Sequence, residues 1–186
     1  SDLSRLAGLE NLQFLWLYAN QITDLSHLAG LTKLQELRLN GNHVSDLSPL
    51  AGLTNLQNLY LADNQISDIS PLAGLTKLGC LQLERNKIVR IPPLPGLTKL
   101  AWLKLDYNQI SDISGLAGVT SLRYIALNHN QLSDISALVA NSQAGGIGHH
   151  PQDSVELLDN LLDLSEGSKA MADIQTLKEN GAAVYY

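Results

Sequence analysis

Two acidic residues of this chain have the side-chain type and the spacing that best suit catalysis or cation binding. Glu84 and Asp106 lie 22 residues apart, the interval at which the whole chain repeats, so they should lie side by side. Paired carboxylates can act as acid and base or hold a cation. Because Arg85 and Lys104 lie nearby and no pocket is implied, we expect a solvated charge cluster, with a weak cation site as the alternative.

The histidine and cysteine residues are weaker candidates for a metal site or a catalytic nucleophile. His149 and His150 lie in a glycine-rich segment and could bind a transition metal, but no third ligand has a zinc-site spacing. Cys80, the single cysteine, has no histidine partner in sequence and is not supported as a nucleophile. There is no glycine-rich phosphate loop or serine-nucleophile motif. We therefore expect a protein that is not an enzyme and has no cofactor or metal.

An asparagine that recurs every 22 residues identifies the elements that position these side chains. The members of this series are Asn20, Asn42, Asn64, Asn86, Asn108 and Asn130. The surrounding pattern is Leu-x-x-Leu-x-Leu-x-x-Asn-x-Ile, as in residues 56–66. Self-similarity at this period predicts a solenoid of stacked coils. The asparagines should form a continuous ladder of buried amides where each chain turn leaves its strand.

Each coil should contain a strand and a short outer segment. Leu37 and Leu39 alternate with outward residues, which predicts a short strand that pairs in parallel with its neighbours. After the asparagine, Ser48-Pro49 and Ser70-Pro71 predict a serine helix cap followed by the first helical residue. The outer wall should therefore be about one turn of helix or 3₁₀ helix per coil.

An aspartate recurs at the start of these outer segments. The series is Asp24, Asp46, Asp68, Asp112 and Asp134, and Arg90 occupies the missing place. Like charges on adjacent coils should repel unless each carboxylate accepts local backbone hydrogen bonds. Arg90 and the prolines that follow it should form a locally rigid turn, with a contact site on the outer wall as the alternative.

Composition excludes several classes of partner. The 186 residues have a formal net charge of −6 and a pI of about 5.2, and no run of lysine or arginine. This argues against nucleic acid or an anionic membrane surface as a partner. No apolar stretch approaches the ~18 residues of a membrane span, so no membrane insertion is expected. The chain opens as the tail of a repeat, which suggests a fragment of a longer protein.

The array should change character near residue 140. Asn130 and Asn160 are 30 residues apart, and the surplus lies in residues 141–151, expected to be a mobile loop. We therefore divide the chain into repeats at 1–140 and an atypical last repeat with a cap at 141–186. A helix over about 166–180 and a last strand at 184–186 should cover the final coil. The edge at Leu12–Leu17 should be uncapped, which favours edge-to-edge self-association.

The aromatic residues fall at outward strand positions. If the strand leucines point inward, seven of the nine aromatics line the concave surface, and the other two lie in the cap. Tryptophan and tyrosine often dominate protein interfaces, whereas the alternative is cross-strand stabilisation. The candidate partner-binding residues are Phe14, Trp16, Tyr18, Glu36, Arg38, Tyr60, Asp63, Glu84, Arg85, Trp102, Lys104, Asp106, Tyr107, Tyr124 and His129.

The 22-residue interval also predicts lateral neighbours. Trp16, Arg38 and Tyr60 share one row, so Arg38 should lie between two rings. A second row holds Cys80, Trp102 and Tyr124, and a third holds Asp63, Arg85, Tyr107 and His129. A protein or peptide partner that spans two aromatic patches would suit this layout.

The repeat pattern, with Ser-Asp-Ile-Ser-Pro-Leu and Gly-Leu-Thr-x-Leu, resembles the leucine-rich repeats of bacterial internalin-like proteins. It is also similar to the repeats of a eukaryotic phosphatase regulatory subunit. The resemblance implies an α/β fold: a right-handed leucine-rich-repeat solenoid with a parallel concave sheet, short 3₁₀ or helical convex turns and a C-terminal helical cap. It favours a bacterial secreted or cell-surface location, with a cytoplasmic one left open.

We therefore expect a non-catalytic module that binds a protein or peptide on its concave face. One alternative is a targeting or regulatory repeat domain of a larger enzyme or effector. Another is a scaffold that binds a cation or a glycan weakly.

Overall fold

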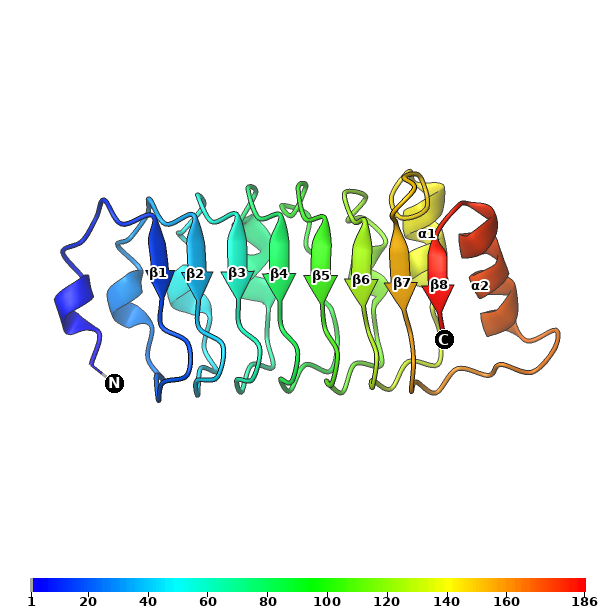
Figure 1. Ribbon diagram of the computed structural model, residues 1–186, viewed down its shortest axis with the longest axis horizontal. Coiled ribbons are helices and arrows are strands. Elements are labelled where there is room, and N and C mark those ends of the chain that lie inside the picture. The colour runs from blue at the N-terminus through cyan, green and yellow to red at the C-terminus, as the bar shows by residue number, and fades with distance from the viewer. Residues whose placement is uncertain (1) are drawn as a thin grey trace.

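The computed structural model describes residues 2–186 and is a solenoid with one parallel sheet of eight strands in chain order (Figure 1). The strands are β1 (Phe14–Trp16), β2 (Glu36–Arg38), β3 (Asn58–Tyr60), β4 (Cys80–Gln82), β5 (Trp102–Lys104), β6 (Tyr124–Ala126), β7 (Ser154–Glu156) and β8 (Ala183–Tyr185). Leu15 pairs with Leu37, and Leu37 with Leu59, so the sequence period becomes the strand register. The predicted solenoid is confirmed.

Short helical segments form the other side of most coils. They are η1 (Ser4–Leu6), η2 (Ser26–Leu28), η3 (Ser48–Leu50), η4 (Ser70–Gly74), η5 (Ser114–Leu116) and the longer α1 (Ser136–Gln143). The proline-rich coil between β4 and β5 has no such segment among the described residues; Arg90 there forms an isolated parallel bridge with Asp112. The few residues between one strand and the next leave room for about one turn of 3₁₀ helix. Longer 3₁₀ runs are uncommon because their hydrogen-bond geometry is poor.

The predicted serine caps are wrong, because the aspartate two residues earlier takes that role. Ser48 is the first residue of η3, and its side chain caps nothing. Instead the Ser48 N–H donates to Asp46 Oδ1 at 2.8 Å, and the Ser48 hydroxyl donates to Asp46 Oδ2 at 2.8 Å. Asp24 and Asp68 accept the same pair of bonds from Ser26 and Ser70. Each carboxylate therefore has local donors, which limits repulsion between coils.

The core is a continuous stack of aliphatic side chains. Leu37, Leu59 and Leu81 are fully buried at the strand centres, and the leucines of the outer segments meet them from the opposite wall. No phenylalanine, tyrosine or tryptophan of residues 2–186 belongs to this core. The Leu/Ile repeat thus fills each coil with side chains of nearly one size, which keeps the coils superimposable.

The buried asparagines connect adjacent coils. Asn64 Nδ2 donates to the carbonyls of Leu39 in the preceding coil and of Leu61 and Ala62 in its own, at 2.9–3.1 Å. Its Oδ1 accepts the Val44 N–H at 2.9 Å. The same pattern recurs at Asn42, Asn86, Asn108, Asn130 and Asn160. Asn20 is exposed, so the predicted ladder of buried amides begins one coil later than expected.

A helix closes the far end of the array. Helix α2 (Lys169–Glu179) begins at Ser168, whose hydroxyl oxygen accepts the Met171 N–H at 3.2 Å. Ile174 and Leu177 on its inner face are buried, and the chain then returns through β8 to pair with β7 (Figure 1). This is the predicted helix and last strand. No helix among residues 2–186 is long and apolar enough to cross a membrane.

We predict that Asn64→Ala lowers the free energy of unfolding by ~2–4 kcal/mol, because it leaves the buried Val44 N–H without a partner and removes three hydrogen bonds to carbonyl oxygens. Asn64→Asp should cost at least as much, since a carboxylate would face three carbonyl oxygens. Urea unfolding followed by circular dichroism measures both. Asn20→Ala is the matched control at the exposed first coil and should cost less than half as much; equal losses would contradict a role for burial.

We predict losses of stability of different size on the two faces of the sheet. Leu59→Ala should cost ~2–5 kcal/mol, because it opens a cavity in the core. Trp16→Ala removes a side chain from a residue that is 60% exposed and should cost less than ~1 kcal/mol. Similar losses in urea unfolding would contradict the assignment of inward and outward positions.

Acid should weaken the outer wall. Hydrogen bonds from the Ser26 and Ser48 backbone and hydroxyl groups lower the pKa of Asp24 and Asp46. A lowered folded-state pKa contributes stability above the unfolded-state value of about 3.9, and that contribution is lost as the pH falls through the folded values. The stability advantage of the wild type over Asp24→Asn/Asp46→Asn, measured by urea unfolding, should therefore shrink between pH ~6 and ~2. An advantage that stays constant with pH would refute this.

Candidate functional site

The residues between the strand leucines line one exposed surface, which we call the sheet face. It comprises the outward side chains of β1–β8 and of the turns that follow them. Phe14, Trp16 and Tyr18 are 56%, 60% and 58% exposed, and Trp102 and Tyr107 are also exposed. Tyr60 and Tyr124 are half-buried by their neighbours. Every candidate aromatic therefore lies on the side predicted for it.

The first predicted row forms a cation–π stack on β1–β3. The Arg38 guanidinium carbon lies 5.1 Å from the Trp16 ring centroid and 4.8 Å from that of Tyr60. Glu36 Oε1 accepts Arg38 Nε–H at 2.7 Å and Trp16 Nε1–H at 2.8 Å. The stack thus holds a guanidinium between two rings and neutralises it with a carboxylate of the same face.

The second row brings Trp102 and Tyr124 together. Their ring centroids are 4.1 Å apart with an interplanar angle of 18°. Cys80 is the neighbour of Trp102 on β4. Burial raises the pKa of the Cys80 thiol, which disfavours the reactive thiolate.

The third row runs along the strand ends and is longer than predicted. Arg85 Nη1 lies 3.9 Å from Asp63 Oδ1, and the Arg85 guanidinium carbon lies 5.0 Å from the Tyr107 ring centroid. Tyr107 stacks on His129 at 4.1 Å, and His129 Nδ1 lies 3.1 Å from Asp159 Oδ2. Asp159 was missed because the extra residues before β7 interrupt the 22-residue count; counting back from Asn160 would have found it.

This row also has unusual backbone geometry. Its residues have φ between 53° and 56°, in the left-handed region that glycine adopts without strain. The members are Asp63, Arg85, Tyr107, His129 and Asp159, preceded by Ala19 and by Gly41. Large polar and aromatic side chains therefore stand at positions where the backbone alone would favour glycine.

Glu84 and Asp106 do not form the open, solvated cluster expected from the sequence. They line a hollow of about 430 Å³ on the sheet face, together with Lys104, Tyr124 and Glu156. The Glu84 side chain is only 19% exposed. We call this site the acidic hollow. Glu156 was missed for the same reason as Asp159, because it follows the irregular spacing.

Hydrogen bonds hold two of the three carboxylates. Asp106 Oδ1 accepts the Asn128 N–H at 3.0 Å. Glu156 Oε1 accepts the Tyr124 hydroxyl at 2.8 Å, and its Oε2 accepts Asn128 Nδ2–H at 2.7 Å. Glu84 Oε1 lies 3.8 Å from Lys104 Nζ, whereas Glu84 Oε2 is buried without a hydrogen-bond partner in the described chain. Glu84 is thus the least satisfied group of the hollow.

The electrostatics of the hollow follow from this arrangement. Burial raises the pKa of Glu84, with Asp106 and Asp63 adding to the effect and Lys104 opposing it. Burial also raises the pKa of Asp106, against hydrogen bonds from Asn128 that lower it. Burial and the hydrogen bond to Glu156 raise the pKa of Tyr124. A nearby positive charge would favour the ionised form of both carboxyls.

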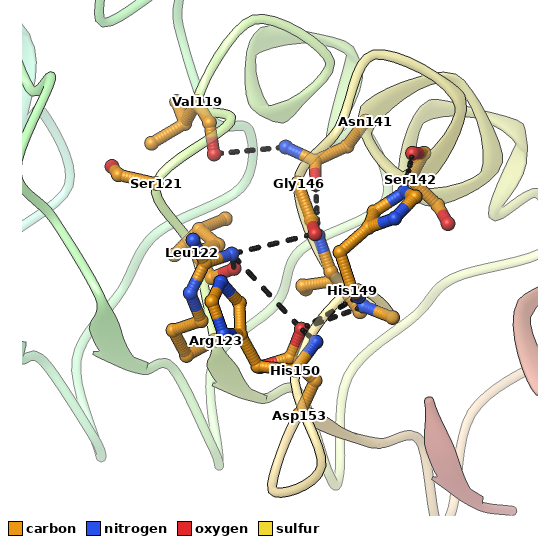
Figure 2. A network of polar contacts seen from close by, with 12 residues as sticks. Val119, Ser121, Leu122, Arg123, Asn141, Ser142, Gly146, His149, His150 and Asp153 are labelled. Atoms are coloured by element: carbon orange, nitrogen blue, oxygen red, sulfur yellow. Dashed lines mark hydrogen bonds and ion pairs between the residues drawn. The ribbon is translucent and has the colours of Figure 1, made fainter. Parts of the chain in front are cut away.

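The histidine candidates lie in a separate network on the loop after α1 (Figure 2). Asp153 Oδ2 accepts the backbone N–H groups of Gly148, His149 and His150 at 2.8–3.1 Å. His149 Nε2 lies 2.8 Å from the Ser142 carbonyl. The expected mobile loop is therefore tied down by a buried carboxylate. No group of three His, Cys, Asp or Glu residues within 2–186 has the arrangement of a metal site.

The chain is similar to known repeat proteins. The model for leucine-rich repeats, with two copies per match, fits residues 2–52, 54–96 and 98–140. No curated protein matches the chain. A solved internalin (inlF) from Listeria monocytogenes is 35% identical with a TM-score of 0.83, over 99% of this chain and 50% of that chain. Internalin C2 from the same species is 37% identical with a TM-score of 0.79, over 96% and 74%.

A more distant structure has the same fold. A leucine-rich-repeat protein of Leptospira interrogans is 23% identical with a TM-score of 0.84, over 98% of this chain and 45% of that chain. The chain thus spans about half the length of the inlF internalin and of the Leptospira protein. The repeat matches and the two internalins show that this chain belongs to the leucine-rich-repeat family and is an internalin-like member of it.

Proposed function

We propose that the chain is a recognition module that binds a protein or peptide through its sheet face. Leucine-rich-repeat proteins generally mediate protein–protein interactions, and the internalin-like ones are typically not enzymes. The observation that carries the proposal for the sheet face is the exposure of Phe14, Trp16 and Tyr18, each more than half exposed on one surface. Large exposed aromatic groups mark interaction sites more often than inert surface.

Cross-strand stabilisation accounts for some of the rings but not for these three. Tyr60 and Tyr124 are half-buried and make contacts that stabilise the sheet, namely the Arg38 stack and the hydrogen bond to Glu156. Phe14 and Tyr18 leave most of their surface in water, and Trp16 contacts Arg38 yet remains 60% exposed. Burial of such rings by a partner would contribute far more than their contacts within the sheet.

No feature of the structure specifically favours the other functions considered. A regulatory role in a larger enzyme, a glycan or cation scaffold, and self-association through residues 12–17 all stay predictions. Leu12, Leu15 and Leu17 at that edge pack against the core but remain partly exposed.

We predict that wild-type protein on a resin captures a partner from bacterial or host lysates, whereas Phe14→Ala/Trp16→Ala/Tyr18→Ala/Trp102→Ala, which removes exposed rings of the sheet face, does not. The captured protein is then purified and its affinity measured by calorimetry. Loss of ring contacts at the centre of an interface should weaken binding by about 30-fold or more.

The matched control is His27→Ala/Thr54→Ala/Thr76→Ala/Lys99→Ala, four exposed positions away from the sheet face. It should capture the same protein with unchanged affinity. Circular dichroism must first show that both variants are folded. Identical capture by the wild type and a folded aromatic variant would contradict recognition through the sheet face.

A further inference from the structure

The acidic hollow has an excess of negative charge that the protein itself does not balance. Its lining brings together Glu84, Asp106 and Glu156 with the single ammonium group of Lys104. Arg85 also borders the hollow, but its guanidinium already contacts Asp63 and the Tyr107 ring. With the carboxyls ionised, three negative groups face one available positive group. Such a surface attracts a cationic partner group.

The distribution of hydrogen bonds within the hollow points to the same conclusion. Asp106 and Glu156 accept bonds from Asn128 and Tyr124, whereas Glu84 Oε2 is buried without a donor among residues 2–186. A buried carboxylate oxygen without a donor is unfavourable. Because Glu84 Oε2 is itself shielded from solvent, a cationic group in the hollow would stabilise the ionised Glu84 side chain through its charge. The hollow therefore has more carboxylates than positively charged groups.

Two sites on the sheet face already hold a guanidinium group of the protein itself. Arg38 lies between the Trp16 and Tyr60 rings with Glu36 at 2.7 Å, and Arg85 lies over Tyr107 beside Asp63. Each site combines an aromatic ring with a carboxylate. The acidic hollow has the same two components, since Tyr124 lines it next to carboxylates, but the arginine at its border is held by other groups.

We propose that the acidic hollow receives a lysine or arginine side chain of the protein partner, whose cationic group pairs with Glu84 and Asp106. This inference rests on the proposed function and specifies the chemistry that the partner presents. A side-chain cation suits the site better than a metal ion, because the described residues offer no converging set of three metal ligands. A cation also fits beside an aromatic wall.

Short peptides test the hollow without knowledge of the partner. The probes are acetyl-Gly-Ser-X-Ser-Gly-amide peptides in which X is arginine, lysine, citrulline or norleucine, and citrulline matches arginine in shape without its charge. In ¹H–¹⁵N NMR titrations, the arginine and lysine peptides should shift the amide signals around Glu84, Asp106 and Glu156 in a saturable way. Citrulline and norleucine should bind about tenfold more weakly or not at all.

The test variant is Glu84→Gln/Asp106→Asn, which should bind the cationic peptides about tenfold more weakly. Both substitutions preserve shape, and the amide oxygen that Asp106→Asn introduces can still accept the Asn128 N–H. Glu156 stays unchanged, since it holds Tyr124 and Asn128. The matched control, Glu10→Gln/Glu166→Gln, removes the same charge at exposed sites outside the hollow and should bind like wild type.

Three results would overturn the inference: equal binding of the citrulline peptide, unchanged binding by the test variant, or no shifts around the hollow at millimolar arginine and lysine peptide. Lysate capture separates it from the proposed function. If the aromatic variant loses a partner that the folded Glu84→Gln/Asp106→Asn variant binds with unchanged affinity, recognition by the sheet face stands and the hollow inference fails. If the cationic peptides bind as expected but no captured protein depends on the rings, the hollow is supported and the aromatic surface is not.

Discussion

The asparagine side chain between adjacent coils is the interaction on which the rest of this structure depends. At Asn64 one amide group bonds carbonyls in its own coil and in the preceding coil, and also accepts the Val44 N–H. These backbone groups lie where the chain leaves the sheet, so neither strand pairing nor solvent can satisfy them. Because the bonds reach from one coil to the next, they fix the register of the coils. Every lateral neighbour on the sheet face follows from that register.

This division of tasks leaves the outward positions free to vary. Leucines fill the coil, asparagine satisfies the turn, and aspartate–serine pairs start the outer segments. The outward strand residues between the leucines belong neither to the core nor to the turns. Aromatic and charged side chains can therefore replace one another at these positions at small cost in stability. The third row, whose residues have left-handed backbone conformations, shows that the choice of residue at outward positions has limits. Arg85 and Tyr107 adopt a backbone conformation that is strained for them, so the local backbone does not explain why they are there.

The sequence predicted the parts of the structure that depend on periodicity. The Arg38 stack and the Trp102–Tyr124 pair follow from a constant interval, because equal spacing in the chain becomes adjacency in the sheet. Glu156 and Asp159 were missed where that interval changes. The serine caps were misassigned because serine and aspartate can each accept the same backbone bond. The acidic hollow was unforeseen for a different reason: burial of Glu84 depends on the combined bulk of side chains from several coils, which no single repeat reveals.

The two ends of the sheet face are therefore not equivalent, although they share the same types of residue. At β1–β3 the protein supplies its own cation, since Arg38 is already held by Glu36 and two rings. The surface that remains exposed there is mainly aromatic. At the acidic hollow the protein supplies three carboxylates but too few positively charged groups to balance them. A partner that satisfied both ends would present apolar surface to the first and a basic side chain to the second. This asymmetry would fix the direction in which an extended partner lies across the coils, because the reverse orientation would bring a basic side chain next to the like charge of Arg38 and leave the carboxylates of the acidic hollow without a further positive charge.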